Sequence, residues 1–251
     1  MLASGASIQT SAQIAAQLGR SPDLLYPALS RFVRRRQLFS PAKGLYVAVP
    51  PEYRSWGVVP ATQFIDAMMT HLGRHYYVSL LSAAEEYGWA HQAPQAFQVM
   101  VDRQLRSRRL GRIRLEFLVN PRAGDDAGVD RRTVRTGSFR IARPELLVLD
   151  LVQYAKQAGG LSNVATVIRE MDGLSTDLLL TLAVDRPRAV LRRLGWLLQQ
   201  FAPFGIDARH VDAAAATEGS PDPLSPDAPE ERGPIDRRWG LIINDTIEPD
   251  I

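Results

Sequence analysis

The sequence predicts an α+β protein, and three patterns along the chain carry this prediction. The first 50 residues hold two short helix patterns and then two short segments in which apolar and polar residues alternate. Segments with strand character recur between residues 96 and 141. From Pro144 to Phe201 the apolar residues recur at helical spacing. This order favours a small helical unit with a hairpin, followed by a mixed α/β domain with a helical, bundle-like region.

The first helix of the N-terminal unit is expected over residues 7–18, with Ser11 as its cap and Gly19 as its end. Its packed face can draw on Ile8, Ala12, Ala15, Ala16 and Leu18. A second helix is expected over residues 22–36, because apolar residues at i, i+3, i+4 and i+7 turn one face inward. These inward residues are Leu25, Ala28, Leu29 and Phe32.

Residues 37–39 and 45–49 then alternate like short strands. They flank Ser40-Pro41-Ala42-Lys43-Gly44, which has the proline and glycine of a hairpin turn. Helix, tight turn, helix and hairpin is the order of a winged helix-turn-helix. Pro27 disturbs this order, because an internal proline removes a backbone donor and clashes with the preceding turn. We therefore expect the second helix to begin late, with Pro27 in its first turn.

The predicted domains are residues 1–50, a linker at 51–60 that follows Pro50-Pro51, and residues 61–251. Helices are expected at 61–72 and 79–87, strands at 96–102 and 113–119, and a weaker strand at 133–141. Further helices are expected at 145–157, 162–171, 176–183 and 188–201. Residues 211–234 are rich in Ala, Pro, Asp and Glu and are expected to form a mobile surface segment before a last strand at 239–243.

Charge is distributed unevenly along the 251 residues, although the net charge is only +3. Residues 1–50 carry six basic groups and one acid, a net charge of +5. Residues 101–143 carry twelve arginines and five acids, a net of +7, whereas residues 207–251 carry eleven acids and four arginines, a net of −7. Separate basic blocks are typical of surfaces that meet phosphate. A solvated, arginine-rich face is the alternative.

The outward face of the second helix has the chemistry of a DNA-reading surface. Its arginines can reach guanine edges or phosphates, its hydroxyls can donate to phosphate, and a lysine lies at the tip of the expected hairpin. The predicted DNA-binding residues are Arg20, Ser21, Tyr26, Ser30, Arg31, Arg34, Arg35 and Lys43. The alternative is that this unit only packs against a partner.

Several stretches together resemble the AbiEi-type antitoxins of type IV toxin-antitoxin and abortive-infection systems. They include Ala28-Leu29 to Phe32-Val33, Gly44-Leu45-Tyr46-Val47, and Pro94-Gln95 before a strand. The most specific stretch is Tyr76-Tyr77-Val78-Ser79-Leu80, followed by Ala83-Ala84 and Tyr87-Gly88. The end of the chain, residues 239–250, also looks like the end of family members.

The resemblance implies a non-enzymatic protein of phage defence with two roles. A cytoplasmic location is expected, because residues 1–10 lack the charged start and the apolar stretch of a signal peptide. Its N-terminal domain would repress its own operon by binding inverted repeats in promoter DNA. Its C-terminal domain would neutralise a nucleotidyltransferase-like toxin, and antitoxins of this class are thought to need no stable complex with the toxin. The alternative function is a winged-helix transcriptional regulator whose C-terminal domain senses a ligand or dimerises, without a toxin partner.

A block of arginines in the C-terminal part has more than one interpretation. It could contact toxin, RNA or DNA phosphate, or its charge could protect the edge of a sheet against aggregation. The block consists of Arg103, Arg106, Arg108, Arg109, Arg112 and Arg114.

Enzymatic and metal chemistry find little support in the sequence. The chain has no cysteine, which excludes thiolate zinc sites and cysteine nucleophiles. His71 and His75 stand at i, i+4, but Gly73 between them indicates a helix end. Gly137-Ser138 upstream of Asp150 faintly resembles a nucleotidyltransferase, yet no second acid accompanies Asp150, which we interpret as a surface or capping residue. We therefore expect no cofactor and no metal. No apolar run is long enough to span a membrane.

Overall fold

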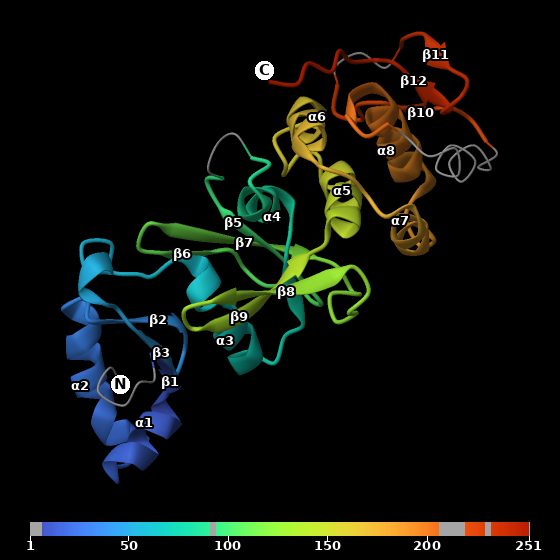
Figure 1. Cartoon of the computed structure of the whole chain (residues 1–251). Helices are drawn as coiled ribbons and strands as arrows, with labels where there is room; N and C mark the ends of the chain where they lie inside the picture. Colours follow the sequence, from blue (N-terminus) through green and yellow to red (C-terminus); the bar gives the residue numbers. More distant parts are fainter. Residues whose placement is uncertain (1–6, 91–93, 206–218, 229–231, 251) are drawn as a thin grey trace. The chain divides into compact units, whose positions relative to one another are not determined.

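The computed structural model describes residues 7–90, 94–205, 219–228 and 232–250, and it is a mixed α+β structure (Figure 1). The chain forms two compact units, each assembled from segments that are not contiguous. The first unit consists of residues 1–78, 95–124 and 131–141, and the second of residues 79–94, 125–130 and 142–251. The predicted boundaries at residues 50 and 60 stay a prediction. Residues 51–53 of the expected linker form a single 3-10 turn.

The first unit begins with β1 (Ile8–Thr10), α1 (Ser11–Leu18) and α2 (Pro22–Arg34). The hairpin of β2 (Leu38–Ala42) and β3 (Leu45–Ala48) follows, and the three strands form an antiparallel sheet in the order β1-β3-β2. Strand β1 was not predicted, since residues 7–10 were assigned to the first helix. That helix instead starts at Ser11 with Thr10 as its cap, and Thr10 and Gln13 form a capping box.

A six-stranded mixed sheet in the order β6-β7-β5-β4-β9-β8 fills the middle of the chain (Figure 1). It is preceded by a 3-10 turn at Ala61–Gln63 and by α3 (Ile65–His71). Strands β5 and β7 pair in parallel over five residues, and β6 and β7 form an antiparallel hairpin. The strands are β4 (Tyr76–Val78), β5 (Phe97–Val101), β6 (Arg108–Leu110), β7 (Ile113–Val119), β8 (Val129–Val134) and β9 (Gly137–Ala142).

The predicted strands at 96–102 and 113–119 are confirmed, but the single weak strand at 133–141 is wrong. Two strands, β8 and β9, occupy this region and are separated by a short turn. Strands β4 and β6 were missed because each has only three residues and too few alternations to give a strand pattern.

The second unit is mainly helical, with α5 (Pro144–Gln153) at its centre. All residues of α5 from Glu145 to Val152 are buried, as expected for a helix that is covered on every side. Four helices pack against α5, and they are α4 (Leu80–Tyr87), α6 (Leu161–Glu170), α7 (Thr176–Ala183) and α8 (Arg188–Phe201). The predicted bounds of α7 and α8 are confirmed.

The C-terminal residues add a small sheet to this unit. Strand β12 (Leu241–Ile242) lies between β10 (Asp222–Pro223) and β11 (Ile235–Asp236). The predicted last strand at 239–243 is therefore confirmed in its centre. Most of the surface segment expected at 211–234 falls in residues 211–218 and 229–231, which lie outside the described residues.

Candidate nucleic-acid interface

Helix α2 carries most of the predicted DNA-binding residues, and its ends follow from its sequence. Ser21 is the cap residue in an extended conformation, and Pro22 stands at the first helical position, where a missing N–H costs nothing. The helix does not begin late, so our expectation for Pro27 was wrong. Pro27 lies inside the helix on an exposed position, where its ring meets solvent rather than the core.

The turn before α2 positions two further predicted residues. Gly19 ends α1 with a positive φ of 60°, and the N–H of Arg20 donates to the Ala15 carbonyl at 3.0 Å. This backbone bond closes the end of α1 and fixes the start of the turn. Arg20 and Ser21 are both exposed.

The inward face of α2 packs on α1 and on the hairpin. Leu25 and Leu29 are buried with Ile14, Leu38 and Tyr46 in one core cluster. Burial raises the pKa of the Tyr46 hydroxyl, and the neighbouring Tyr26 raises it further.

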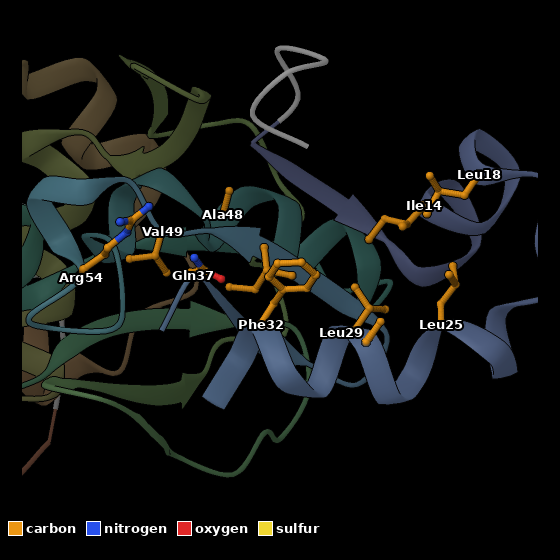
Figure 2. Close-up of a pocket in the computed structure, with 11 residues that line it drawn as sticks. Ile14, Leu18, Leu25, Leu29, Phe32, Gln37, Ala48, Val49 and Arg54 are labelled. Carbon is orange, nitrogen blue, oxygen red and sulfur yellow. The ribbon is translucent and has the colours of Figure 1, made fainter. Parts of the chain in front are cut away.

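An apolar groove of about 350 Å³ opens beside this core (Figure 2). Phe32 and Leu18 line the groove and keep 46% and 59% of their surface exposed. The prediction that both face the core was therefore wrong. Ala12 and Ala16 of the expected packed face of α1 are exposed as well.

The outward face of α2 presents arginines without acidic partners. Arg31, Arg34 and Arg35 are exposed, and no carboxylate of the described chain lies within 4.0 Å of their guanidinium groups. Tyr26 is 68% exposed and Ser30 is half-buried. These side chains are therefore free to meet a ligand of opposite charge.

The hairpin turn is shorter than predicted. Strand β2 runs through Pro41 to Ala42, and only Lys43 and Gly44 form the turn, where Gly44 has a positive φ of 81°. Pro41 is tolerated because β2 is an edge strand with an irregular register between Phe39 and Ala42. Lys43 is exposed at the tip, as its predicted role requires.

Backbone and side-chain contacts hold this turn from two sides. The Ser11 N–H donates to the Gly44 carbonyl at 2.8 Å. On the other side, His71 Nε2 lies 2.9 Å from the Lys43 carbonyl, and Arg108 Nη1 donates to the Pro41 carbonyl at 2.7 Å. These contacts could not be predicted from the sequence, since 28 and 67 residues separate the partners.

The arginine block falls on the β6–β7 hairpin and on the loop before it. Arg109 and Arg114 are direct cross-strand partners, both are exposed, and neither has an ion-pair partner in the described chain.

The guanidinium of Arg112 lies over the Trp56 ring, 5.8 Å from its centroid. Arg103 pairs with Asp102 at 3.5 Å, and Arg106 is exposed. Trp56 was not predicted as a site residue.

A buried polar cluster in the second unit contains none of the predicted site residues. The Ser79 hydroxyl donates to Asp150 Oδ2 at 2.8 Å, and Arg186 Nη2 lies 2.8 Å from Asp150 Oδ1. Asp150 is fully buried, so the prediction that it is a surface or capping residue was wrong. Leu80, which follows Ser79, has a positive φ of 52°, an unfavourable conformation for leucine.

The Ser79 cluster lies within the stretch of chain that the comparison with known families recognises. Residues 77–200 match the family described as the AbiEi antitoxin C-terminal domain. The chain therefore carries an AbiEi antitoxin C-terminal domain. No curated protein sequence matches this antitoxin.

A solved structure that the comparison found shares the fold of the antitoxin over most of its length. It is the crystal structure of the RV2827C protein from Mycobacterium tuberculosis, with a TM-score of 0.68 and 18% sequence identity. The match covers 94% of this antitoxin and 85% of that chain.

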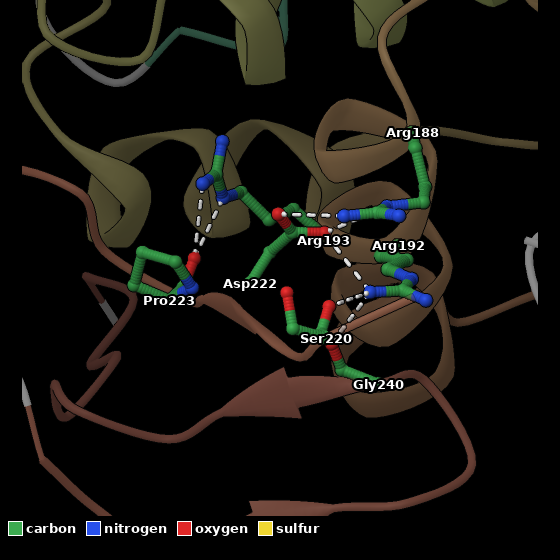
Figure 3. A network of polar contacts seen from close by, with 7 residues as sticks. All are labelled: Arg188, Arg192, Arg193, Ser220, Asp222, Pro223 and Gly240. Carbon is green, nitrogen blue, oxygen red and sulfur yellow. Dashed lines mark hydrogen bonds and ion pairs between the residues drawn. The ribbon is translucent and has the colours of Figure 1, made fainter. Parts of the chain in front are cut away.

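In this antitoxin a network of arginines fastens the C-terminal strands to α8 (Figure 3). Asp222 pairs with Arg188 at 3.2 Å and with Arg192 at 3.0 Å, while Arg193 donates twice to the Pro223 carbonyl. Arg192 also donates to the Ser220 and Gly240 carbonyls. Burial lowers the pKa of Arg193 from its usual value. Because α8 falls within the matched residues, this network fastens the small sheet to the antitoxin domain.

The described residues contain no helix that is long and apolar enough to cross a membrane. They contain no group of three or more histidines and carboxylates close enough to share a metal ion. His71 and His75, considered as a pair from the sequence, have separate surroundings, since His71 contacts the Lys43 carbonyl and the His75 ring lies beside Gly124.

Proposed function

We propose that this antitoxin represses its own operon by binding promoter DNA through α2 and the β2–β3 turn. The observation that carries the proposal is the row of exposed, unpaired arginines on the outer face of α2. This helix is the second of two helices joined by a tight turn and followed by a hairpin, and this order supports the proposal of a winged helix-turn-helix arrangement. In that arrangement the second helix enters the major groove.

The proposed contacts follow from side-chain chemistry. Arg31 and Arg34 would meet guanine edges or phosphates, and Arg35 would meet phosphate. The helix would be positioned on the DNA backbone by Tyr26, Ser30, Arg20 and Ser21. The Lys43 side chain would contact the adjacent groove. A surface of this kind binds with strong salt dependence, because each neutralised phosphate releases counterions.

We further propose that the β6–β7 hairpin contacts DNA phosphates rather than serving only as edge protection. Like charges directly opposite each other across two strands destabilise a sheet. Arg109 and Arg114 are such a pair, and no acid of the described chain compensates them. A bound phosphate would relieve their repulsion. The bond from Arg108 to the Pro41 carbonyl ties this hairpin to β2, the strand that leads to Lys43.

The DNA-binding proposal is tested by fluorescence anisotropy with a duplex of the chain's own promoter. Arg31→Ala combined with Arg34→Ala should weaken binding by about tenfold for each arginine lost. The matched control is Arg169→Ala with Arg237→Ala, which removes the same charge from two exposed positions elsewhere. Equal affinity of the two double variants would refute the assignment of α2.

We also propose that the antitoxin neutralises a nucleotidyltransferase-like toxin, as the AbiEi antitoxin domain at residues 77–200 suggests. The test is growth rescue when this chain is expressed together with a neighbouring nucleotidyltransferase gene product that arrests growth. If the Arg31→Ala, Arg34→Ala double variant still rescues growth, toxin neutralisation does not depend on repression through α2. A chain that binds its promoter and never rescues growth would instead be a transcriptional regulator without a toxin partner.

A further inference from the structure

The turn that carries Lys43 is fixed by a residue far from it in sequence. His71, the last residue of α3, places its Nε2 2.9 Å from the Lys43 carbonyl oxygen. A carbonyl oxygen can only accept, so Nε2 carries the hydrogen and donates it. Lys43 and His71 belong to the same compact unit.

The surroundings of the turn leave it little freedom. A side chain on Gly44 would approach the His71 ring to 3.9 Å and the Ser11 hydroxyl to 3.5 Å, so the ring and Ser11 enclose the turn from two sides. Near the start of β2, Phe39 packs edge-on against Phe64, with ring centroids 5.1 Å apart. The Lys43 side chain is exposed, and so is the side chain of His71, which contacts the Lys43 carbonyl.

We propose that His71 is a positioning residue that holds Lys43 ready for DNA, a role that rests on the proposed function. The pairing of Ala42 with Leu45 and the Ser11 bond to the Gly44 carbonyl hold the base of the turn, and His71 adds a side-chain restraint on the Lys43 carbonyl itself. Ordering a loop on binding lowers affinity, and a turn that is already fixed avoids this loss. His71 therefore raises promoter affinity without touching the duplex.

Two substitutions at one site separate the hydrogen bond from the bulk of the ring. His71→Leu keeps a side chain of similar bulk but removes the N–H donor, and it should weaken promoter binding by about tenfold, the effect of one well-placed hydrogen bond. His71→Gln retains an N–H donor of similar reach and should restore the affinity to within about twofold of the wild type. A failure of glutamine to restore binding would contradict the hydrogen-bond role.

A double-mutant cycle with Lys43→Ala decides whether His71 acts through Lys43. The Lys43 carbonyl remains in the alanine variant, so His71→Leu should still lower the melting temperature there. It should no longer lower promoter affinity, because no charge is left to position. An equal affinity loss in both backgrounds would overturn the proposal and would indicate a general structural role.

The outcomes distinguish the two proposals. A wild-type chain that binds no promoter duplex overturns the proposed function and this inference together. A wild-type chain that binds, with His71→Leu binding equally well, overturns the inference alone.

Discussion

The indole ring of Trp239 occupies the space that a side chain on Gly195 would need. A Cβ atom on Gly195 would lie 2.0 Å from Cζ3 of Trp239. Trp239 is 1% exposed, and its Nε1 donates to Gln199 Oε1 at 2.8 Å. The lack of a side chain at Gly195 in α8 thus makes room for the buried indole ring of Trp239.

Gly195→Ala should lower the free energy of unfolding by about 1–3 kcal/mol, because the added methyl group displaces the buried indole. Denaturant unfolding, followed by tryptophan fluorescence, measures the loss. Gly173→Ala is the matched control, since no atom lies within 4 Å of the new methyl group and Gly173 has no positive φ. A similar small change in both variants would show that α8 adjusts to the methyl group.

Asp150→Asn should lower the free energy of unfolding by about 3 kcal/mol, because it leaves the Arg186 guanidinium without its buried counterion. Asp150 is fully buried, so water cannot take the place of the lost carboxylate beside the guanidinium. Thermal or denaturant unfolding gives the size of the effect.

The double variant Asp150→Leu with Arg186→Met provides the control for this pair. It removes both charges, so it should be destabilised by less than the sum of the two single substitutions. Strict additivity would show that the ion pair contributes nothing of its own.

The sequence allowed prediction of those elements whose signals are local. Thr176–Ala183 and Arg188–Phe201 were predicted to the residue, because apolar residues recur there at helical spacing. Short strands such as Arg108–Leu110 were not, since three residues with two arginines carry no strand pattern.

The candidate DNA-binding site could be predicted only where a single element, helix α2, holds its residues. The outward arginines of α2 follow from helical periodicity, which is a local property. The contacts of His71 with the Lys43 carbonyl and of Asp150 with Ser79 join residues 28 and 71 positions apart, and the folded chain alone brings them together. For the same reason Asp150 was misinterpreted, because its partners are not its neighbours in sequence.

Tyr76→Phe should remove part of the loss of stability at alkaline pH. Burial raises the pKa of the Tyr76 hydroxyl well above its usual value of 10.0, and the phenol donates to Asp66 Oδ1 at 2.9 Å. Above pH 10 the unfolded tyrosine ionises while the folded one stays protonated, so stability is complete below pH 10 and falls as the pH rises.

The slope from one such group approaches about 1.4 kcal/mol per pH unit, and Tyr76→Phe should reduce the total slope by that amount. Urea unfolding of both chains between pH 9 and about 11 measures it. A residual slope is expected, because the pKa values of Tyr46 and Tyr154 are raised as well. Identical slopes in the two chains would show that Tyr76 ionises freely in the folded state.

Arg109→Glu should move stability and DNA affinity in opposite directions. It replaces the repulsion between Arg109 and Arg114 with a cross-strand ion pair, which should stabilise the fold by about 0.2–1 kcal/mol. It also removes a phosphate contact and adds a negative charge, so promoter affinity should fall and the salt dependence of binding should decrease by about one counterion.

Arg109→Gln separates the two effects, because it removes the repulsion without adding an acid. If affinity and salt dependence are unchanged while stability rises, the hairpin arginines protect a sheet edge and do not bind DNA.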